Sequence, residues 1–523
     1  MDNDQSIKIN ILYTSDIHGS IYPIYYANNE PAEWGLSKIA TKIKKERAKD
    51  NQLLLIDNGD LIQGTPLTYH YVQYLKDHEH PLIRLLNHLS YDAAVIGNHE
   101  FNYGLDLLKR AVNESDFPWL SANIVDSKSG NPYFGKPYII KEVKSVKVAI
   151  LGVTTHYIPN WEKAENIEGI EFKETLQETK KWVAYIRENE KPDVLIVSYH
   201  GGFERDLETG EPIEVLTGEN QGFAICNEVE GIDVLLTGHQ HRSLIGNVNG
   251  VEVIQVPFKG QALGKVTLTL NKRKEILKKS TKLLFMDEVE ADRQILELAA
   301  KNENETQKWL DTPIGIVDRD MLITDPLRVR TQDNPFIEFI NKVQMDIVGV
   351  EISNTALFDN TSPGFPKQIT MRDIVANYIY PNTLVVLRLS GHDIKLALEQ
   401  SANYFTIDQA GELAVNPSFI QPKPQHYNYD MWEGIDYILD ITKPIGQRVT
   451  KLYFKNAVLD LDATFDVVMN NYRAGGGGDY MMFKGKPVVK DIPMDMTELI
   501  ANYISERKEI QATVNHNWKV IWA

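Results

Sequence analysis

The stretch "AAVIGNHEFNYG" (93–104) decides the fold class of the first half of the chain. Four apolar residues, the pattern of a buried strand, lead directly into an amide (Asn98), an imidazole (His99) and a second amide (Asn102). Polar groups at the end of a buried strand are typical of a sheet edge that binds a ligand. The stretch also raises a chemical question, because a carboxylate at position 102 would be the more obvious partner for an active imidazole.

The same pattern occurs at five places in the first half of the chain. Each is a short run of β-branched residues or leucines that ends in a polar loop, and segments with helical spacing, such as 35–50, lie between them. Buried strands with helical crossovers predict a layered α/β domain, with further strands near 251–256 and 263–270. The five places are "KINILYTSDIHG" (8–19), "QLLLIDNGD" (52–60), "AAVIGNHE" (93–100), "DVLIVSYHGG" (193–202) and "DVLLTGHQH" (233–241).

Length, charge and cysteine content exclude several classes of protein. A chain of 523 residues is too long for one ordinary core, so two or three domains are expected. The formal net charge of -17 argues against a nucleic-acid polymer as partner, because such binding depends on Lys and Arg patches. The single cysteine, Cys226, excludes an intramolecular disulfide and a thiolate metal cluster.

Neither a membrane span nor an export signal is expected. Apolar runs such as "LLLI" (53–56) and "VLIV" (194–197) are far shorter than a membrane span. The N-terminal ten residues lack the basic segment and apolar core of a signal peptide. We therefore expect a cytoplasmic protein, although a mature secreted chain without its leader would have the same sequence. The oligomeric state stays open.

A polar, charged segment predicts the boundary between two domains. Residues 286–312 are expected to form an exposed linker helix between a first domain, 1–285, and a second domain, 313–523. The second domain has the mixed texture of an α+β fold. Its one low-complexity tract is the run of four glycines in "RAGGGGD" (473–479).

The strand ends supply seven side chains that suit metal ions. Carboxylate, amide and imidazole ligands without thiolate favour Zn, Mn or Fe(II), and seven ligands fit two ions that share a carboxylate. One histidine near a strand end is usually an ordinary polar residue, and His78, His80 and His88 are expected on solvated helices. The ordered set within one domain is what indicates a site. Its members are Asp16, His18, Asp60, Asn98, His200, His239 and His241.

Together these motifs resemble the calcineurin-like metallophosphoesterases, and the whole chain resembles the two-domain 5'-nucleotidase superfamily. The nearest resemblance is to its 2',3'-cyclic-nucleotide 2'-phosphodiesterase/3'-nucleotidase branch. It covers nearly the full length and includes "ENQGFAICNEVEGID" (219–233), "YNYDMWEGIDYILDIT" (427–442) and "NNYRAGGGGD" (470–479). It implies a four-layer α-β-β-α metallophosphoesterase domain, an α/β fold, followed by an α+β nucleotide-binding domain.

The resemblance also implies how two divalent ions would share the ligands. One ion would be held by Asp16, His18 and His241, and the other by Asn98, His200 and His239. Asp60 would bridge the two ions. A hydroxide between them would attack phosphorus in line with the leaving oxygen.

Two further residues of the opening stretch are implied as catalytic. His99 would stabilise the phosphoryl charge or protonate the departing sugar oxygen, and Asn102 would orient it. In the 5'-nucleotidase branch the residue at position 102 is usually Asp, whereas the phosphodiesterase-like branch tends to have Asn. Asn102 therefore favours the phosphodiesterase-like branch.

The second domain is expected to recognise the nucleoside. By resemblance, Tyr380 and Tyr472 would stack on the base, and Asn382 and Asp479 would contact base or ribose. One departure from the family concerns the arginine-bearing loop that helps 5'-nucleotidases hold substrate. The segment 351–368 has no clear counterpart to that loop, which weakens a 5'-nucleotidase assignment.

These observations lead to an enzyme that hydrolyses nucleoside 2',3'-cyclic phosphates and nucleoside 3'-monophosphates with two divalent ions. A 5'-nucleotidase or nucleotide-sugar hydrolase on the same scaffold is the first alternative. The second alternative is a nucleotide-sensing protein with vestigial catalysis. The expected partner is a small nucleotide, without a nucleic-acid polymer or a membrane.

Overall fold

The chain forms two compact units, which are described separately. The computed structural model describes residues 6–523 apart from positions 161, 215, 379, 381, 422 and 493. The units are Met1–Thr306 and Gln307–Ala523, and the division falls inside helix α7 (Arg293–Leu310). Helix α7 is shorter than the expected linker helix and is not fully exposed, because Ile295 and Ala299 are buried in the first unit. The domain limits given above stay predictions.

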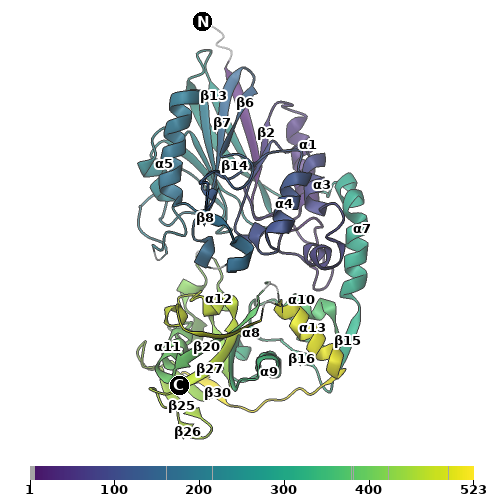
Figure 1. Ribbon diagram of the computed structural model, residues 1–523, viewed down its shortest axis with the longest axis vertical. Helices are drawn as coiled ribbons and strands as arrows, with labels where there is room; N and C mark the ends of the chain where they lie inside the picture. The colour runs from purple at the N-terminus through teal and green to yellow at the C-terminus, as the bar shows by residue number, and fades with distance from the viewer. Residues whose placement is uncertain are drawn as a thin grey trace. The chain divides into compact units, whose positions relative to one another are not determined.

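Two six-stranded sheets form the centre of the first unit (Figure 1), which also has a two-stranded sheet of β5 (Ile124–Asp126) and β8 (Ile170–Phe172). The first sheet has the order β14 (Ile276–Phe285), β13 (Ala262–Leu270), β1 (Ile7–Thr14), β2 (Leu54–Asp57), β3 (Ala93–Val95), β4 (Trp119–Leu120). The second has the order β11 (Leu244–Val248), β12 (Val251–Gln255), β10 (Val234–Thr237), β9 (Val194–His200), β7 (Val146–Thr154), β6 (Tyr138–Val143). The strands expected near 251–256 and 263–270 are β12 and β13.

Apolar clusters show that the first unit has four layers. Ile11 of the first sheet and Val148 and Val234 of the second share one buried cluster, so the two sheets face each other. The outer face of the first sheet packs against α1 (Leu36–Arg47), α3 (Pro81–His88) and α4 (Leu105–Glu114). The outer face of the second packs against α5 (Thr175–Tyr185) and α6 (Gly222–Glu228), and Figure 1 shows α5 and α4 on opposite sides. The expected α-β-β-α order is confirmed.

Parallel pairing brings the polar strand ends to one edge of each sheet. In the first sheet β1 pairs parallel with β2, and β2 with β3. In the second sheet β9 pairs parallel with β7 and β10. The loops that follow β1, β2, β3, β9 and β10 are the five motif loops of the sequence, so they leave the sheets at carboxyl ends.

His80 differs from expectation. It is the residue before α3, not a solvated helical residue, and only 1% of its surface is exposed. Its ring packs edge-on against Tyr71, with the ring centroids 4.8 Å apart. Packing within the helical layer buries this residue, which the helical periodicity of the sequence does not predict. His78 and His88 are exposed, His78 in a turn and His88 at the end of α3.

A five-stranded sheet is the centre of the second unit. Its order is β23 (Asp430–Glu433), β17 (Ile352–Ala356), β27 (Thr464–Asn470), β20 (Leu384–Ser390), β28 (Val488–Ile492). A second sheet has the order β26 (Ala457–Val458), β25 (Val449–Phe454), β24 (Asp436–Asp440), β30 (Trp518–Ile521). A third has the order β19 (Gln368–Thr370), β15 (Pro313–Val317), β29 (Glu509–Ile510). The mixed α+β texture expected from the sequence is confirmed.

Helices cover the sheets of the second unit. Local sequence sets their ends: α9 (Pro335–Val348) starts with an Asn334 cap and a proline, and ends at left-handed Gly349. The other helices include α8 (Pro326–Val329), α10 (Met371–Asn377), α11 (Gly391–Ala402), α12 (Asn471–Ala474) and α13 (Met496–Arg507). Among the described residues, no helix combines the length and the apolar character that a membrane span needs.

Candidate active site

Strained backbone marks the loops that follow the strands. Five of the expected ligands have left-handed backbone, a conformation that costs a non-glycine residue about 1–3 kcal/mol and is concentrated at functional sites. The tight turns that these φ angles produce direct the side chains back over the ends of the strands. The residues are Asp16 (φ 55°), His18 (φ 49°), Asp60 (φ 56°), His239 (φ 68°) and His241 (φ 58°).

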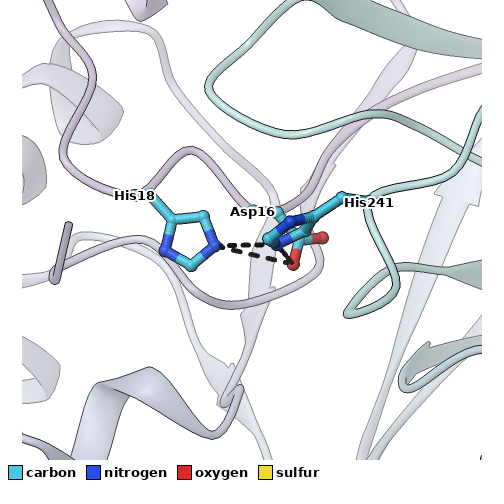
Figure 2. A group of neighbouring side chains, drawn as sticks. All are labelled: Asp16, His18 and His241. Carbon is cyan, nitrogen blue, oxygen red and sulfur yellow. Dashed lines mark hydrogen bonds and ion pairs between the residues drawn. The ribbon is translucent and has the colours of Figure 1, made fainter. Parts of the chain in front are cut away.

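The first cluster of ligand atoms joins the β1 and β10 loops. One ligand atom each from Asp16, His18 and His241 lie within 4.8 Å of one another. Figure 2 shows the two imidazoles converging on the carboxylate of Asp16. His18 Nε2 lies 3.1 Å from His241 Nε2, which in turn lies 3.4 Å from Asp16 Oδ1. The backbone carbonyl of Gln63 is 3.0 Å from His18 Nδ1, so Nδ1 carries the proton and Nε2 presents a lone pair to the cluster.

The second cluster joins the β2, β3, β9 and β10 loops. Ligand atoms of Asp60, His200 and His239 lie within 4.8 Å of one another. The amide oxygen of Asn98 is 3.1 Å from His200 Nε2 and 2.9 Å from His239 Nδ1. His200 Nε2 is also 3.2 Å from Asp60 Oδ2. All seven side chains expected to bind metal are therefore gathered in these two clusters.

Outer contacts fix which nitrogen of each ring faces the second cluster. The Asn58 carbonyl lies 2.7 Å from His200 Nδ1, and the Glu219 carboxylate lies 2.8 Å from His239 Nε2. Each of these oxygens accepts a hydrogen bond from the ring, so His200 Nε2 and His239 Nδ1 are the ring atoms that face Asn98 and Asp60. Burial opposes the charge, but the Asp60 carboxylate raises the pKa of His200 to about 10, so Nε2 holds a proton that a divalent cation would displace on binding.

The donor set fits divalent metal ions. Calcineurin-like phosphoesterase domains use such ions, and nitrogen and oxygen ligands without thiolate suit Zn, Mn or Fe(II). His18 Nε2 is 3.9 Å from Asp16 Oδ1 and 3.9 Å from Asp60 Oδ2, which places Asp60 within reach of both clusters. Burial lowers the pKa of His18 to about 3, so its imidazole is neutral, as metal ligation requires.

Glu100 holds the loop that carries Asp60, a role that the sequence did not reveal. Its carboxylate is fully buried and accepts hydrogen bonds from the backbone N–H groups of Asp60 (2.9 Å), Leu61 (2.6 Å) and Gly97 (2.7 Å). A Cβ at Gly97 would lie 2.4 Å from Asp60 Oδ1, so only glycine fits beside this loop. The local sequence "NHE" does not predict this contact, because Glu100 and Asp60 lie in two loops 40 residues apart.

The structure pairs His99 with Asn102, as expected. Asn102 Oδ1 is 2.6 Å from His99 Nδ1, and the His99 backbone N–H donates to Asp60 Oδ1 at 2.8 Å. The His99 ring packs edge-on against His18 with centroids 5.2 Å apart, so His99 borders the first cluster. The amide nitrogen of Asn102 donates to Glu162 Oε2 at 2.7 Å. Glu162 was missed because it lies 60 residues away in a loop without a recognisable pattern.

Aromatic rings gather in the second unit. The Tyr427 ring lies between the two expected stacking residues, 5.9 Å from Tyr380 and 6.2 Å from Tyr472 between centroids. Tyr427 lies in a quoted family stretch, but nothing in the sequence distinguished it from its neighbours. A Cβ at Gly477 would lie 2.5 Å from the Tyr472 ring, so the glycine run allows the backbone to pass directly beside that ring.

A buried ion pair fixes the backbone of this aromatic group. Arg473 and Asp430 are each 1% exposed, and Arg473 Nε is 2.7 Å from Asp430 Oδ2. The same guanidinium donates to the carbonyls of Tyr427 and Gly477 and stacks on the Tyr480 ring. Burial alone would lower the pKa of Arg473, but the Asp430 carboxylate holds that pKa above its ordinary value.

The two expected polar contacts of the nucleoside lie near these rings in sequence. The backbone N–H of Asn382 donates to the carbonyl of Tyr380 at 2.8 Å, and its own carbonyl accepts from Met496. Asp479 is exposed at the end of the glycine run and has a left-handed φ of 66°. The roles of both residues in binding stay predictions.

Arg330 contacts the segment 351–368, which itself contains no arginine. Its guanidinium is 1% exposed and donates to the Leu357 carbonyl at 2.9 Å and to Asn360 Oδ1 at 2.7 Å. It also lies over the Tyr404 ring. An arginine buried in this way braces the loop from inside the unit.

Comparisons with known proteins give a consistent family. A family model for calcineurin-like phosphoesterase matches residues 9–243, and one for the 5'-nucleotidase C-terminal domain matches residues 313–485. The "Trifunctional nucleotide phosphoesterase protein YfkN" of Bacillus subtilis (strain 168) is 28% identical over 98% of this chain, which spans only 39% of that protein. A "2',3'-cyclic-nucleotide 2'-phosphodiesterase/3'-nucleotidase" of Yersinia enterocolitica is 27% identical over 98% of this chain and 88% of that protein.

One solved structure is similar over its whole length. It is described as "Putative 5'-Nucleotidase from Staphylococcus aureus in complex with alpha-ketoglutarate". The two chains are 34% identical, with a TM-score of 0.91, over 98% of this chain and 100% of that one.

Proposed function

The chain belongs to the 5'-nucleotidase family that joins a calcineurin-like phosphoesterase domain to a 5'-nucleotidase C-terminal domain, and from this premise we propose its substrate. The family consists of nucleotide phosphoesterases. Within it, the proposed reaction is hydrolysis of nucleoside 2',3'-cyclic phosphates, followed by hydrolysis of nucleoside 3'-monophosphates. The observation that carries the proposal is the pair of clusters in which carboxylate, amide and imidazole ligand atoms converge around Asp60.

The first unit is assigned the chemistry on phosphate. Two divalent ions, when bound, supply positive charge for the phosphoryl oxygens and make water a nucleophile at neutral pH. Asp60 is proposed to contact both ions. The ligands proposed for one ion are Asp16, His18 and His241, and those for the other are Asn98, His200 and His239.

His99 is proposed to protonate the departing sugar oxygen or to stabilise the charge on the phosphoryl group. Its ring borders the first cluster, and its backbone N–H holds Asp60 Oδ1. Asn102 Oδ1 accepts a hydrogen bond from His99 Nδ1, so His99 Nε2 is the ring atom that can contact a substrate. The second unit is assigned recognition of the nucleoside, with Tyr380 and Tyr472 stacking on the base.

A 5'-nucleotidase activity is the second candidate function. The 34% identity to the Staphylococcus aureus chain, which carries that description, favours it. Asn at position 102 and the absence of an arginine from residues 351–368 favour the cyclic-nucleotide reaction instead. A nucleotide sensor with vestigial catalysis is disfavoured, because such a protein has no physical need for seven metal-ligand side chains gathered in two clusters.

A panel of substrates tests the proposal. Protein reconstituted with Zn²⁺, Mn²⁺ or Fe²⁺ is given 2',3'-cAMP, 3'-AMP, 5'-AMP and UDP-glucose at equal concentration, and the nucleotide and nucleoside products are separated by chromatography and measured. We expect turnover of the first two substrates to exceed that of the others. Fast turnover of 5'-AMP without cyclic-nucleotide activity would replace the proposal with the 5'-nucleotidase, and no turnover of any would favour the sensor.

A further inference from the structure

The loop around Glu162 packs onto the turn that carries His99. Asn102 lies at the end of the 3-10 turn His99–Phe101, and its side chain lies between an imidazole and a carboxylate. Its Oδ1 is 2.6 Å from His99 Nδ1, and its Nδ2 is 2.7 Å from Glu162 Oε2. A carboxylate is therefore present near the imidazole, but one amide further away than in a direct pair.

Other hydrogen bonds hold Glu162 in place. Asn166 Nδ2 donates to Glu162 Oε1 at 2.9 Å, and the Lys163 backbone N–H donates to the same oxygen at 2.8 Å. Asn166 also approaches the Asn102 carbonyl at 3.5 Å. One carboxylate oxygen is thus occupied by its own loop, and the other faces Asn102.

The chemistry of these groups fixes the direction of the amide. A carboxylate only accepts hydrogen bonds, so the NH₂ group of Asn102 must face Glu162 and its oxygen must face His99. The His99 ring then carries a proton on Nδ1, and its plane is held by that hydrogen bond. Among the described residues, no group bonds to His99 Nε2, which stays the ring atom that can meet a substrate.

The reversed amide would have the opposite effect. An NH₂ group against Nδ1 would require Nδ1 to accept and would move the ring proton to Nε2. Without a carboxylate beyond it, an asparagine could adopt either direction. The contact with Glu162 removes this choice.

We propose that Glu162 is a positioning residue for His99, acting through Asn102 to fix the tautomer and orientation of the ring during phosphoester hydrolysis. This inference rests on the proposed function of the same site. It explains why an amide at position 102 can serve where a carboxylate would be expected, because Glu162 supplies the carboxylate from the far side of that amide.

Glu162→Gln tests the first link. A glutamine of equal size can both donate and accept, so it no longer dictates the direction of the Asn102 amide. The matched control is Glu165→Gln, which removes the same charge from an exposed side chain in the same loop. With bis-p-nitrophenyl phosphate and with 2',3'-cAMP, we expect kcat of Glu162→Gln to fall about tenfold, the value of one charged hydrogen bond, with KM unchanged. A kcat equal to that of Glu165→Gln would overturn the proposal.

A second background gives a result that a merely structural role would not produce. In Asn102→Asp a carboxylate contacts His99 directly and lies against Glu162, so two like charges meet. Adding Glu162→Gln to this background is expected to leave kcat unchanged or to raise it. The same tenfold loss in both backgrounds would show that Glu162 does not act through residue 102.

Stability and overall activity keep the outcomes distinct. Unfolding midpoints of Glu162→Gln and Glu165→Gln are expected to agree. If Glu162→Gln does not fold, Asn166→Ala removes the 2.9 Å hydrogen bond to Glu162 Oε1 and a 3.5 Å contact to the Asn102 backbone carbonyl, and leaves the Asn102 side chain intact. A fall in kcat in the same direction is then required. Absence of hydrolysis of any phosphoester by the unaltered protein would refute the proposed function itself, whereas hydrolysis that is insensitive to Glu162 would refute only this inference.

Discussion

Removing the charge of Asp430 is the perturbation whose result the structure specifies most fully. Asp430→Asn keeps the shape of the side chain but leaves the Arg473 guanidinium, 1% exposed, without its counter-charge. Breaking a buried pair by losing one partner costs about 3–5 kcal/mol, because the remaining charge is neither paired nor solvated. Since Arg473 also holds the Tyr427 and Gly477 carbonyls, the aromatic group should loosen as well.

The assay combines urea denaturation with kinetics. We expect the free energy of unfolding of the second unit to fall by about 3–5 kcal/mol and KM for 3'-AMP to rise, with KM for p-nitrophenyl phosphate little changed. The matched control is Asp466→Asn, which breaks the exposed pair between Arg388 and Asp466 in the same sheet, an interaction worth about 0–1 kcal/mol. Equal unfolding free energies for the two variants would refute the reasoning about the buried pair.

Three further predictions concern single side chains. Tyr472→Ala should raise KM for nucleotides far more than for p-nitrophenyl phosphate, by the ~1–3 kcal/mol of one ring–base contact; equal effects would remove Tyr472 from the base site. Glu219→Gln, which alters the 2.8 Å contact to His239 Nε2, should weaken metal binding about 10–100-fold in a chelator competition, and an unchanged affinity would count against the tautomer assigned to His239. Burial lowers the pKa of His80 from 6.5 to about 3, so the unfolded chain takes up a proton that the folded chain refuses. His80 should therefore cost no stability above pH 6.5 and about 2 kcal/mol at pH 5, and the loss of stability between these pH values should be smaller by that amount in His80→Phe; identical pH profiles of the two proteins in urea titrations would contradict it.

Sequence pattern was sufficient for the layered fold and for the gathering of the ligand side chains. Each expected ligand lies at or just after the end of a buried strand, and parallel strands end at a common edge, so local periodicity also locates Asp16 and His200 in space. The pairing of His99 with Asn102 could also be predicted from the sequence, because the two residues are three positions apart in one turn.

The supporting groups could not be predicted, for a physical reason. Glu100, Glu162 and Glu219 act through hydrogen bonds between loops that only the tertiary fold brings together. Charged residues in polar loops are usually solvated, so their sequence context gives no sign of such contacts. The expected exposure of His80 is wrong for a similar reason, since its ring packs on Tyr71 and its backbone N–H donates to Glu114 of α4, contacts that helical periodicity does not show.

The amide of the opening stretch now has a defined environment. The Asn102 side chain lies between His99 and Glu162. The carboxylate of Glu162 therefore acts on the His99 ring through the amide of Asn102 and not by direct contact. The Asn102→Asp background described above separates these two arrangements directly.

Metal content is the most direct test of the central claim that two clusters share Asp60. Mass spectrometry of protein dialysed against Zn²⁺ or Mn²⁺ should give two ions per chain. His241→Ala and His200→Ala should each retain one ion, and Asp60→Ala should weaken both. A chain that saturates with a single ion, or an Asp60→Ala variant that still binds two ions with unchanged affinity, would contradict the account.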